Sequence, residues 1–173
     1  MELLNDLKLA VDLEQRGFDY YTKTAGKTSN PLVVSTFNSL AERELLHLER
    51  AKSIYQNLTG QVPLPADLAD KISISRAKLL APILHHLKKG LAKDFSSTSD
   101  MNMAYKVAEE MEQFSYKLYD KINAEATDPL VKKFYAALAL EEREHFAILQ
   151  ETLVYLNDPG EWYRQNERWI IEG

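Results

Sequence analysis

The sequence predicts an all-α protein. Its expected architecture is an antiparallel four-helix bundle of two helical hairpins, joined by one long crossover and followed by a short C-terminal helix. Apolar residues recur at helical spacing over four long stretches, and six glycines and six prolines are too few to interrupt them. The first two stretches also repeat in the last two at a constant offset of 98 residues, so the hairpins are expected to be internal copies.

The first hairpin is expected over residues 3–58. Its first helix ends at Gly26, and Asn30 and Pro31 suit the N-cap and the first position of a second helix, which Gly60 closes. Both helices carry an apolar stripe that contains isolated ionisable residues. The residues expected on the two inward faces are Leu7, Ala10, Val11, Glu14, Phe18, Tyr21, Phe37, Leu40, Ala41, Glu44, His47, Leu48, Ala51 and Tyr55.

Residues 59–99 are expected to form the crossover. Its stretch 79–93 is basic and amphipathic, and packing across the bundle end is a simpler interpretation of it than binding to a membrane surface. His85 and His86 have no glutamate three residues before them, so we expect them to belong to the crossover and not to a metal site.

The second hairpin is expected over residues 100–157. Residues 96–100 offer several N-cap candidates for the third helix, and Asp128 and Pro129 repeat the cap-then-proline start of the second helix. The tail, 158–173, is expected to hold the short C-terminal helix. The inward faces are expected to present Val107, Ala108, Met111, Glu112, Ser115, Tyr119, Val131, Tyr135, Leu138, Ala139, Glu142, His145, Phe146 and Leu149.

Length and composition favour one domain over residues 1–173 and exclude several classes of protein. The net charge of −5 argues against a nucleic-acid partner. The absence of cysteine excludes disulfides, thiolate metal sites and a rubredoxin-type iron centre, so any metal must be held by carboxylates and imidazoles. No apolar run approaches the roughly 18 residues of a membrane span, and the N-terminus lacks signal-peptide features. A cytoplasmic location is therefore expected.

A Glu-x-x-His motif occurs twice, in the second and in the fourth predicted helix. Each copy has a further glutamate 30 residues upstream, and one offset relates all pairs, since 112 − 14, 142 − 44 and 145 − 47 each equal 98. Residues i and i+3 of a helix share a face and lie about 5 Å apart. The repeated residues are therefore expected to face the interior of the bundle together: Glu14, Glu44, His47, Glu112, Glu142 and His145.

This residue set predicts a two-metal site. Four ionised carboxylates cannot be buried together unless cations cancel their charge, and two divalent ions would do so. We expect Glu44 and Glu142 to bridge the two ions. Glu14 and His47 would then be the terminal ligands of one ion, and Glu112 and His145 those of the other. Oxygen-rich ligands with one nitrogen per metal suit iron or manganese better than zinc or copper. The predicted cofactor is two iron ions, with manganese or a mixed iron–manganese pair as the alternative.

Other residues near the motifs are not expected to be metal ligands. Tyr21 and Tyr119 follow the upstream glutamates by seven residues and are expected to face inward, where they could hydrogen-bond ligand carboxylates or relay electrons. They are the candidate catalytic residues beyond the ligands. Glu109, Glu141 and Glu144 have no glutamate partner at the offset of 98. We therefore expect Glu109 to be exposed or at the rim, and Glu141 and Glu144 to be solvated.

The strings at residues 40–47 and 138–145 resemble the second and fourth helices of the rubrerythrin-like branch of the ferritin-like di-iron carboxylate proteins. The resemblance covers roughly residues 5–157, includes all six ligand positions and extends to the tail at 161–173. It implies a ferritin-like fold, a di-iron centre that reacts with O2 or hydrogen peroxide, and a homodimer.

Two departures from the rubrerythrin pattern change what the resemblance implies. Rubrerythrins proper carry an additional glutamate three residues after the ligand of the third helix, where this chain has Ser115. That glutamate takes part in the peroxidase cycle, and the ligand set without it resembles the symmetric site of bacterioferritin. The rubredoxin domain is also missing, so electrons must come from an external donor protein.

The leading functional hypothesis is an oxidoreductase that reduces O2 or hydrogen peroxide at a di-iron centre. The alternative is a non-catalytic iron-binding or iron-storage protein of the ferritin-like type. A structural bundle whose glutamates and histidines merely pair in the core is the third hypothesis. A hydroxylase is a further enzyme option, but no residues of the sequence define a pocket for an organic substrate.

Overall fold

The computed structural model describes residues 2–60, 63, 98–162 and 164–165. The long helices of this part of the chain are α1 (Glu2–Ala25), α2 (Pro31–Leu58), α5 (Ser99–Glu125) and α6 (Pro129–Asn157). No strand occurs among the described residues. α1 packs along α2, α5 packs along α6, and the two hairpins meet mainly where α1 faces α5. The all-α four-helix bundle predicted from the sequence is confirmed.

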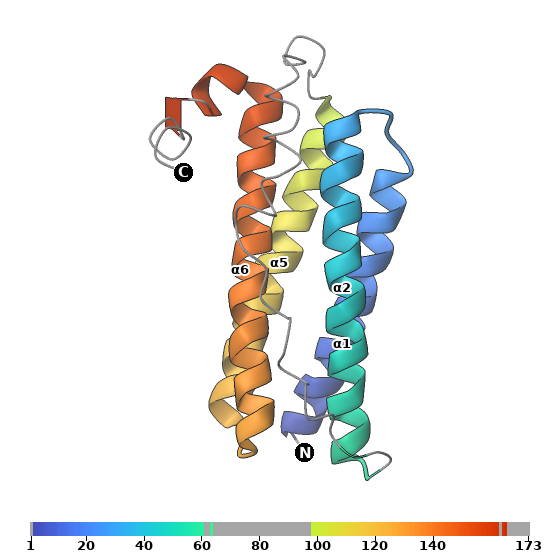
Figure 1. The fold of residues 1–173 in the computed structure, drawn as a ribbon, viewed down its shortest axis with the longest axis vertical. Coiled ribbons are helices and arrows are strands. Elements are labelled where there is room, and N and C mark those ends of the chain that lie inside the picture. Colours follow the sequence, from blue (N-terminus) through green and yellow to red (C-terminus); the bar gives the residue numbers. More distant parts are fainter. Residues whose placement is uncertain (1, 61–62, 64–97, 163, 166–173) are drawn as a thin grey trace.

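The two hairpins run in opposite senses (Figure 1). The turn between α1 and α2 lies at one end of the bundle, and the turn between α5 and α6 lies at the other end. α2 therefore ends, and α5 begins, at opposite ends of the molecule, which is the geometry that a long crossover requires. The basic stretch 79–93, with His85 and His86, lies outside the described residues.

The predicted helix starts and stops are present in the structure. The Asn30 side chain accepts hydrogen bonds from the backbone N–H groups of Leu32 and Val33, at 3.0 and 3.2 Å. Asp128 caps α6 in the same way, and a proline occupies the first helical position in both cases. Thr98 caps α5, and Gly60 follows α2 with a φ of +77°, a value that suits glycine.

The buried apolar residues form two clusters, one toward each end of the bundle. The residues of one cluster come from the second half of α1, the first half of α2, the first half of α5 and the second half of α6, with Trp162 beyond it. The residues of the other cluster come mainly from the first half of α1, the second halves of α2 and α5, and the first half of α6. The ionisable residues of the inward faces lie between the two clusters along every helix. The middle of the bundle is therefore polar and both ends are apolar.

The predicted inward faces were too wide at their edges. Six of their apolar residues are only partly buried: Val11, Phe18, Tyr55, Val107, Met111 and Phe146. Ile54 and Tyr105, which the prediction left out, are fully buried. None of the described helices combines the length and the apolarity needed to cross a membrane.

The start of the tail packs on the bundle. Residues 159–162 are helical, in agreement with the predicted C-terminal helix. The Trp162 ring is fully buried and meets Tyr155 edge-on, with ring centroids 5.6 Å apart. The fold of the described residues therefore extends past α6.

We predict that Asp128→Ala lowers the free energy of unfolding by about 1 kcal/mol, because two N–H groups at the start of α6 lose their acceptor. Urea unfolding followed by circular dichroism measures this change. Asp128→Asn is the matched control, since its side-chain oxygen also caps helices well. Equal losses in both variants would contradict the capping role.

Candidate metal centre

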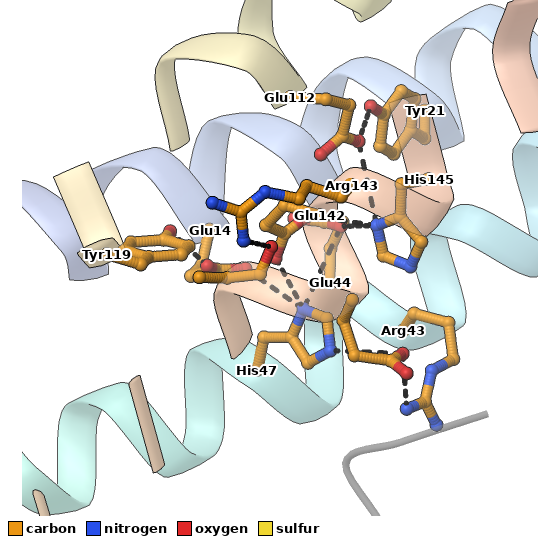
Figure 2. A network of polar contacts seen from close by, with 12 residues as sticks. Glu14, Tyr21, Arg43, Glu44, His47, Glu112, Tyr119, Glu142, Arg143 and His145 are labelled. Atoms are coloured by element: carbon orange, nitrogen blue, oxygen red, sulfur yellow. Dashed lines mark hydrogen bonds and ion pairs between the residues drawn. The ribbon is translucent and has the colours of Figure 1, made fainter. Parts of the chain in front are cut away.

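The middle of the bundle holds four carboxylates and two imidazoles, supplied by all four long helices (Figure 2). α1 and α5 each give one glutamate, and α2 and α6 each give a glutamate and a histidine. All six side chains are between 0 and 4% exposed. The structure thus brings together every residue that the sequence predicted as a ligand: Glu14, Glu44, His47, Glu112, Glu142 and His145.

Three carboxylates surround one ring nitrogen of His47. Its Nδ1 lies 3.1 Å from Glu142 Oε1 and 3.5 Å from Glu14 Oε2. The Glu44 carboxylate approaches the same nitrogen to 3.9 Å. Two donors at right angles around a small divalent ion, with bonds of about 2.1 Å, lie about 3 Å apart. The spacing around His47 therefore suits donors that share a cation.

His145 has the equivalent surroundings. Its Nδ1 lies 3.0 Å from Glu142 Oε2 and 3.1 Å from Glu44 Oε1. Glu112 Oε1 is 3.7 Å away. The two imidazoles stack on each other with ring centroids 5.5 Å apart and an interplanar angle of 18°. The two histidines therefore face one shared set of carboxylates.

The six side chains divide into two overlapping groups of four. One group is Glu14, Glu44, His47 and Glu142, and the other replaces its first and third members by Glu112 and His145. Within each group, one ligand atom per residue lies within 4.8 Å of all the others. Glu44 and Glu142 belong to both groups. This geometry indicates a metal-binding site with two shared carboxylates.

The donor atoms fit a cation because they are buried and lack hydrogen bonds. Glu14 Oε2, Glu44 Oε1, Glu142 Oε1 and His47 Nδ1 have no hydrogen-bond partner among the described residues. Buried polar atoms are normally satisfied, and an unsatisfied charged oxygen is costly. All four atoms point into the space that the two ligand groups enclose. Carboxylate oxygens with one imidazole per ion form a donor set suited to iron or manganese.

The charges of these groups oppose one another when no cation balances them. Burial raises the pKa of Glu44, and the neighbouring Glu142 raises it further. The pKa of Glu142 is raised for the same reasons, with Glu112 as the main neighbouring charge. Burial opposes the ionisation of Glu112 and His145 as well, but their attraction lowers the pKa of Glu112, and Glu142 raises that of His145. In the absence of a cation, protonation of Glu44, Glu142 and His145 is therefore favoured.

Two tyrosines tie the upstream glutamates across the bundle. The Tyr21 hydroxyl, from α1, donates a hydrogen bond to Glu112 Oε1 on α5, and the Tyr119 hydroxyl, from α5, donates to Glu14 Oε1 on α1. Burial and the adjacent carboxylate raise the pKa of both phenols well above the ordinary value. Each tyrosine therefore remains a donor and orients the glutamate of the other hairpin (Figure 2).

Gly17 belongs to the site but was not singled out in the sequence. A Cβ atom at this position would lie 2.6 Å from Glu44 Oε2, so any larger residue would force that carboxylate to move from its observed place. Its position in the sequence could have indicated this role, because Gly17 lies three residues after Glu14 and therefore on the same inward face of α1. Its partner at the offset of 98 is Ser115, which is also buried.

The prediction that Glu141 is solvated was wrong. The side chain is 2% exposed, and its carboxylate accepts a 2.9 Å hydrogen bond from Arg43. Its Oε2 also lies 4.0 Å from His47 Nε2. The prediction rested on the residue at the equivalent position of the first hairpin, which is Arg43 and not a glutamate. It failed because Arg43 itself forms the ion pair that allows the Glu141 carboxylate to be buried. Glu109 is partly buried, as expected of a rim residue, whereas Glu144, which was predicted to be solvated, is partly buried too.

Comparison with protein-family models matches residues 5–153 to the rubrerythrin family. The chain belongs to the rubrerythrin family. Searches of curated proteins and of solved structures give no match. The matched residues of this rubrerythrin-family chain include all six residues of the candidate metal centre.

The carboxylates of the candidate site in this chain are distributed evenly between its two halves. Each half supplies one unshared and one shared glutamate. The position of the additional glutamate of rubrerythrins proper holds Ser115, a buried side chain without a carboxylate. The site of this chain is therefore more symmetric in its ligands than the rubrerythrin pattern implies.

We predict that Gly17→Ala weakens divalent-metal binding by about tenfold or more, because the new methyl group displaces the Glu44 carboxylate. The side chain of Glu44 can rotate away, so circular dichroism should show an unchanged fold. Gly26→Ala is the control, since its nearest atoms would be backbone oxygens at 3.6 and 3.7 Å. Isothermal titration with Mn²⁺ measures the affinities, and equal affinities in both variants would contradict the packing role of Gly17.

We predict that the metal-free protein loses stability as the pH rises between about pH 5 and pH 8. The raised pKa values of Glu44, Glu142 and His145 mean that the folded state binds more protons than the unfolded state above the ordinary glutamate range. The lowered pKa of Glu112 acts only below that range.

The metal-loaded protein is expected to show the opposite trend, because cations replace the protons and bind more tightly as the carboxylates ionise. Thermal unfolding of the metal-free and the Mn²⁺-loaded protein across this pH interval tests both statements. Parallel changes of the melting temperature in the two forms would contradict a metal site made of these residues.

Proposed function

We propose that the protein is a di-iron oxidoreductase that reduces O2 or hydrogen peroxide with electrons from a separate donor. The observation that carries this proposal is the pair of shared carboxylates. Glu44 and Glu142 each lie in both ligand groups, so two cations held by the two groups would share these carboxylates and could act together on one small molecule. Membership in the rubrerythrin family supports the same reaction class.

In this proposal the two halves of the site hold one ion each. Glu14 and His47 are the unshared ligands of one ion, and Glu112 and His145 are those of the other. Iron ions bound there would supply the electrons for reducing the oxidant, and manganese or a mixed pair would fit the same ligand set. The oxygen-rich donor groups support this choice over zinc or copper.

The chain orients the ligands and excludes bulk water from them. The apolar clusters on either side of the site keep bulk water from the carboxylates. Tyr21 and Tyr119 hold Glu112 and Glu14 in place, and each keeps its own proton at the hydroxyl because its pKa is raised. The fixed ligands then need little rearrangement when the oxidant enters.

The electron donor is a separate protein in this proposal. The 173 residues contain no cysteine, so they cannot form the iron–thiolate centre of a rubredoxin domain. The homodimer and the cytoplasmic location expected from the sequence stay predictions.

We predict that Glu44→Ala and Glu142→Ala each remove measurable binding of two iron ions per chain. Each change deletes a carboxylate shared by both ligand groups, so its effect should exceed the roughly 10–100-fold loss typical of groups behind a ligand. Folding should survive, since each change also removes a buried carboxylate that repels its neighbours. Glu110→Ala, at an exposed position of α5, is the control.

The activity test mixes the Fe²⁺-loaded protein separately with O2 and with H2O2 and follows oxidant loss over many equivalents, with a chemical reductant present. Repeated turnover in the wild type and in Glu110→Ala, with none in the Glu44 and Glu142 variants, is the expected result. A single stoichiometric oxidation followed by accumulation of ferric iron would favour the storage alternative. Iron uptake no higher than in the Glu44→Ala, Glu142→Ala double variant would sink both.

A further inference from the structure

The two halves of the metal site have the same ligands but different neighbours. Arg43 on α2 and Glu141 on α6 occupy equivalent positions of the two hairpins, because their numbers differ by 98. Ligand positions match across this offset, glutamate with glutamate and histidine with histidine. At positions 43 and 141 the pair instead has opposite charges. Any effect of these side chains on the metals must therefore differ between the halves.

Glu141 lies behind one histidine of the site. Its Oε2 is 4.0 Å from His47 Nε2, the ring nitrogen opposite the Nδ1 that faces the three ligand carboxylates. This distance is too long for a hydrogen bond, so the carboxylate acts through its charge. Arg43 holds the Glu141 carboxylate through the 2.9 Å ion pair, and its own side chain is 15% exposed. A buried carboxylate is thus fixed beside His47.

His145 has no such neighbour in the described part of the chain. The Nε2 atoms of both histidines are buried and lack a hydrogen-bond partner there, but only that of His47 has a carboxylate within 4.0 Å among the described residues. The carboxylates that approach His145 all approach Nδ1. The position equivalent to Glu141 holds the cationic Arg43. The two imidazoles therefore differ in what lies on the side away from the ligands.

We infer that Glu141 makes the two metal positions unequal, so that the ion at Glu14 and His47 is held more tightly than the ion at Glu112 and His145. A histidine that binds a metal through Nδ1 carries its proton on Nε2, and the negative charge of a carboxylate near that proton makes the ring a stronger donor to the metal. Glu141 is a positioning residue, because it acts through His47. The inference rests on the proposed function only in requiring that two ions bind.

The test uses the protein loaded with two Zn²⁺ ions, a redox-silent probe, and labelled with ¹⁵N in its four histidines. A competing chelator is added in steps, and the ring-nitrogen resonances of His47 and His145 are followed by NMR, with assignments from single-histidine variants. The His145 resonances are expected to revert to the metal-free form first, at a chelator concentration about 10–100-fold lower than the His47 resonances.

Glu141→Gln keeps the size of the side chain and an acceptor for Arg43 but removes the charge beside His47. It should narrow the interval between the two release steps, whereas Glu110→Gln, at the exposed position on α5, should leave it unchanged. The double exchange Arg43→Glu with Glu141→Arg keeps the ion pair and reverses it, so His47 should then lose its ion first. Circular dichroism checks the fold of each variant.

The outcomes separate the two proposals. If neither histidine responds to Zn²⁺ in the wild type, the metal site itself is wrong and the proposed function falls with it. If two ions bind but both histidines release them together, the inference of unequal positions is overturned. An unchanged interval in a folded Glu141→Gln variant overturns it as well, because another feature must then cause the inequality.

Discussion

Four carboxylates that face one another inside a helical bundle are the constraint on which this protein depends. Their burial and their mutual repulsion raise the pKa of Glu44 and of Glu142, which favours the protonated form of these two. Cations remove this conflict, because they satisfy the unpaired oxygens and the charge at once. The apolar clusters on either side strengthen both effects, since they keep water from the carboxylates.

The site also joins the two hairpins. The ligand group of His47 includes Glu142, and that of His145 includes Glu44, so neither hairpin supplies a complete ligand group alone. The tyrosines cross in the same way, each from one hairpin to the unshared glutamate of the other. Metal binding and the docking of the hairpins are therefore coupled, as expected for a site whose ligands come from facing helices.

The two hairpins have identical residues at the candidate ligand positions but different residues around them. Gly17 leaves room for Glu44, while its equivalent in the second hairpin is the serine at position 115. Arg43 and Glu141 form an ion pair with each other because equivalent residues of α2 and α6 meet across the bundle. A duplicated chain can thus keep two matching sets of candidate ligands and still give each ligand group a different electrostatic surrounding.

The sequence alone determined the four helices, their caps and the six clustered residues. Helical periodicity and a repeat offset depend only on spacing along the chain, as the matching of Glu14, Glu44 and His47 with their counterparts shows. The tertiary structure decided which groups meet across helices. Tyr21 reaches the glutamate of α5 and not that of α1, and Glu141 is buried against Arg43. Spacing within a helix gives the direction of a side chain, whereas its partner depends on how the helices pack.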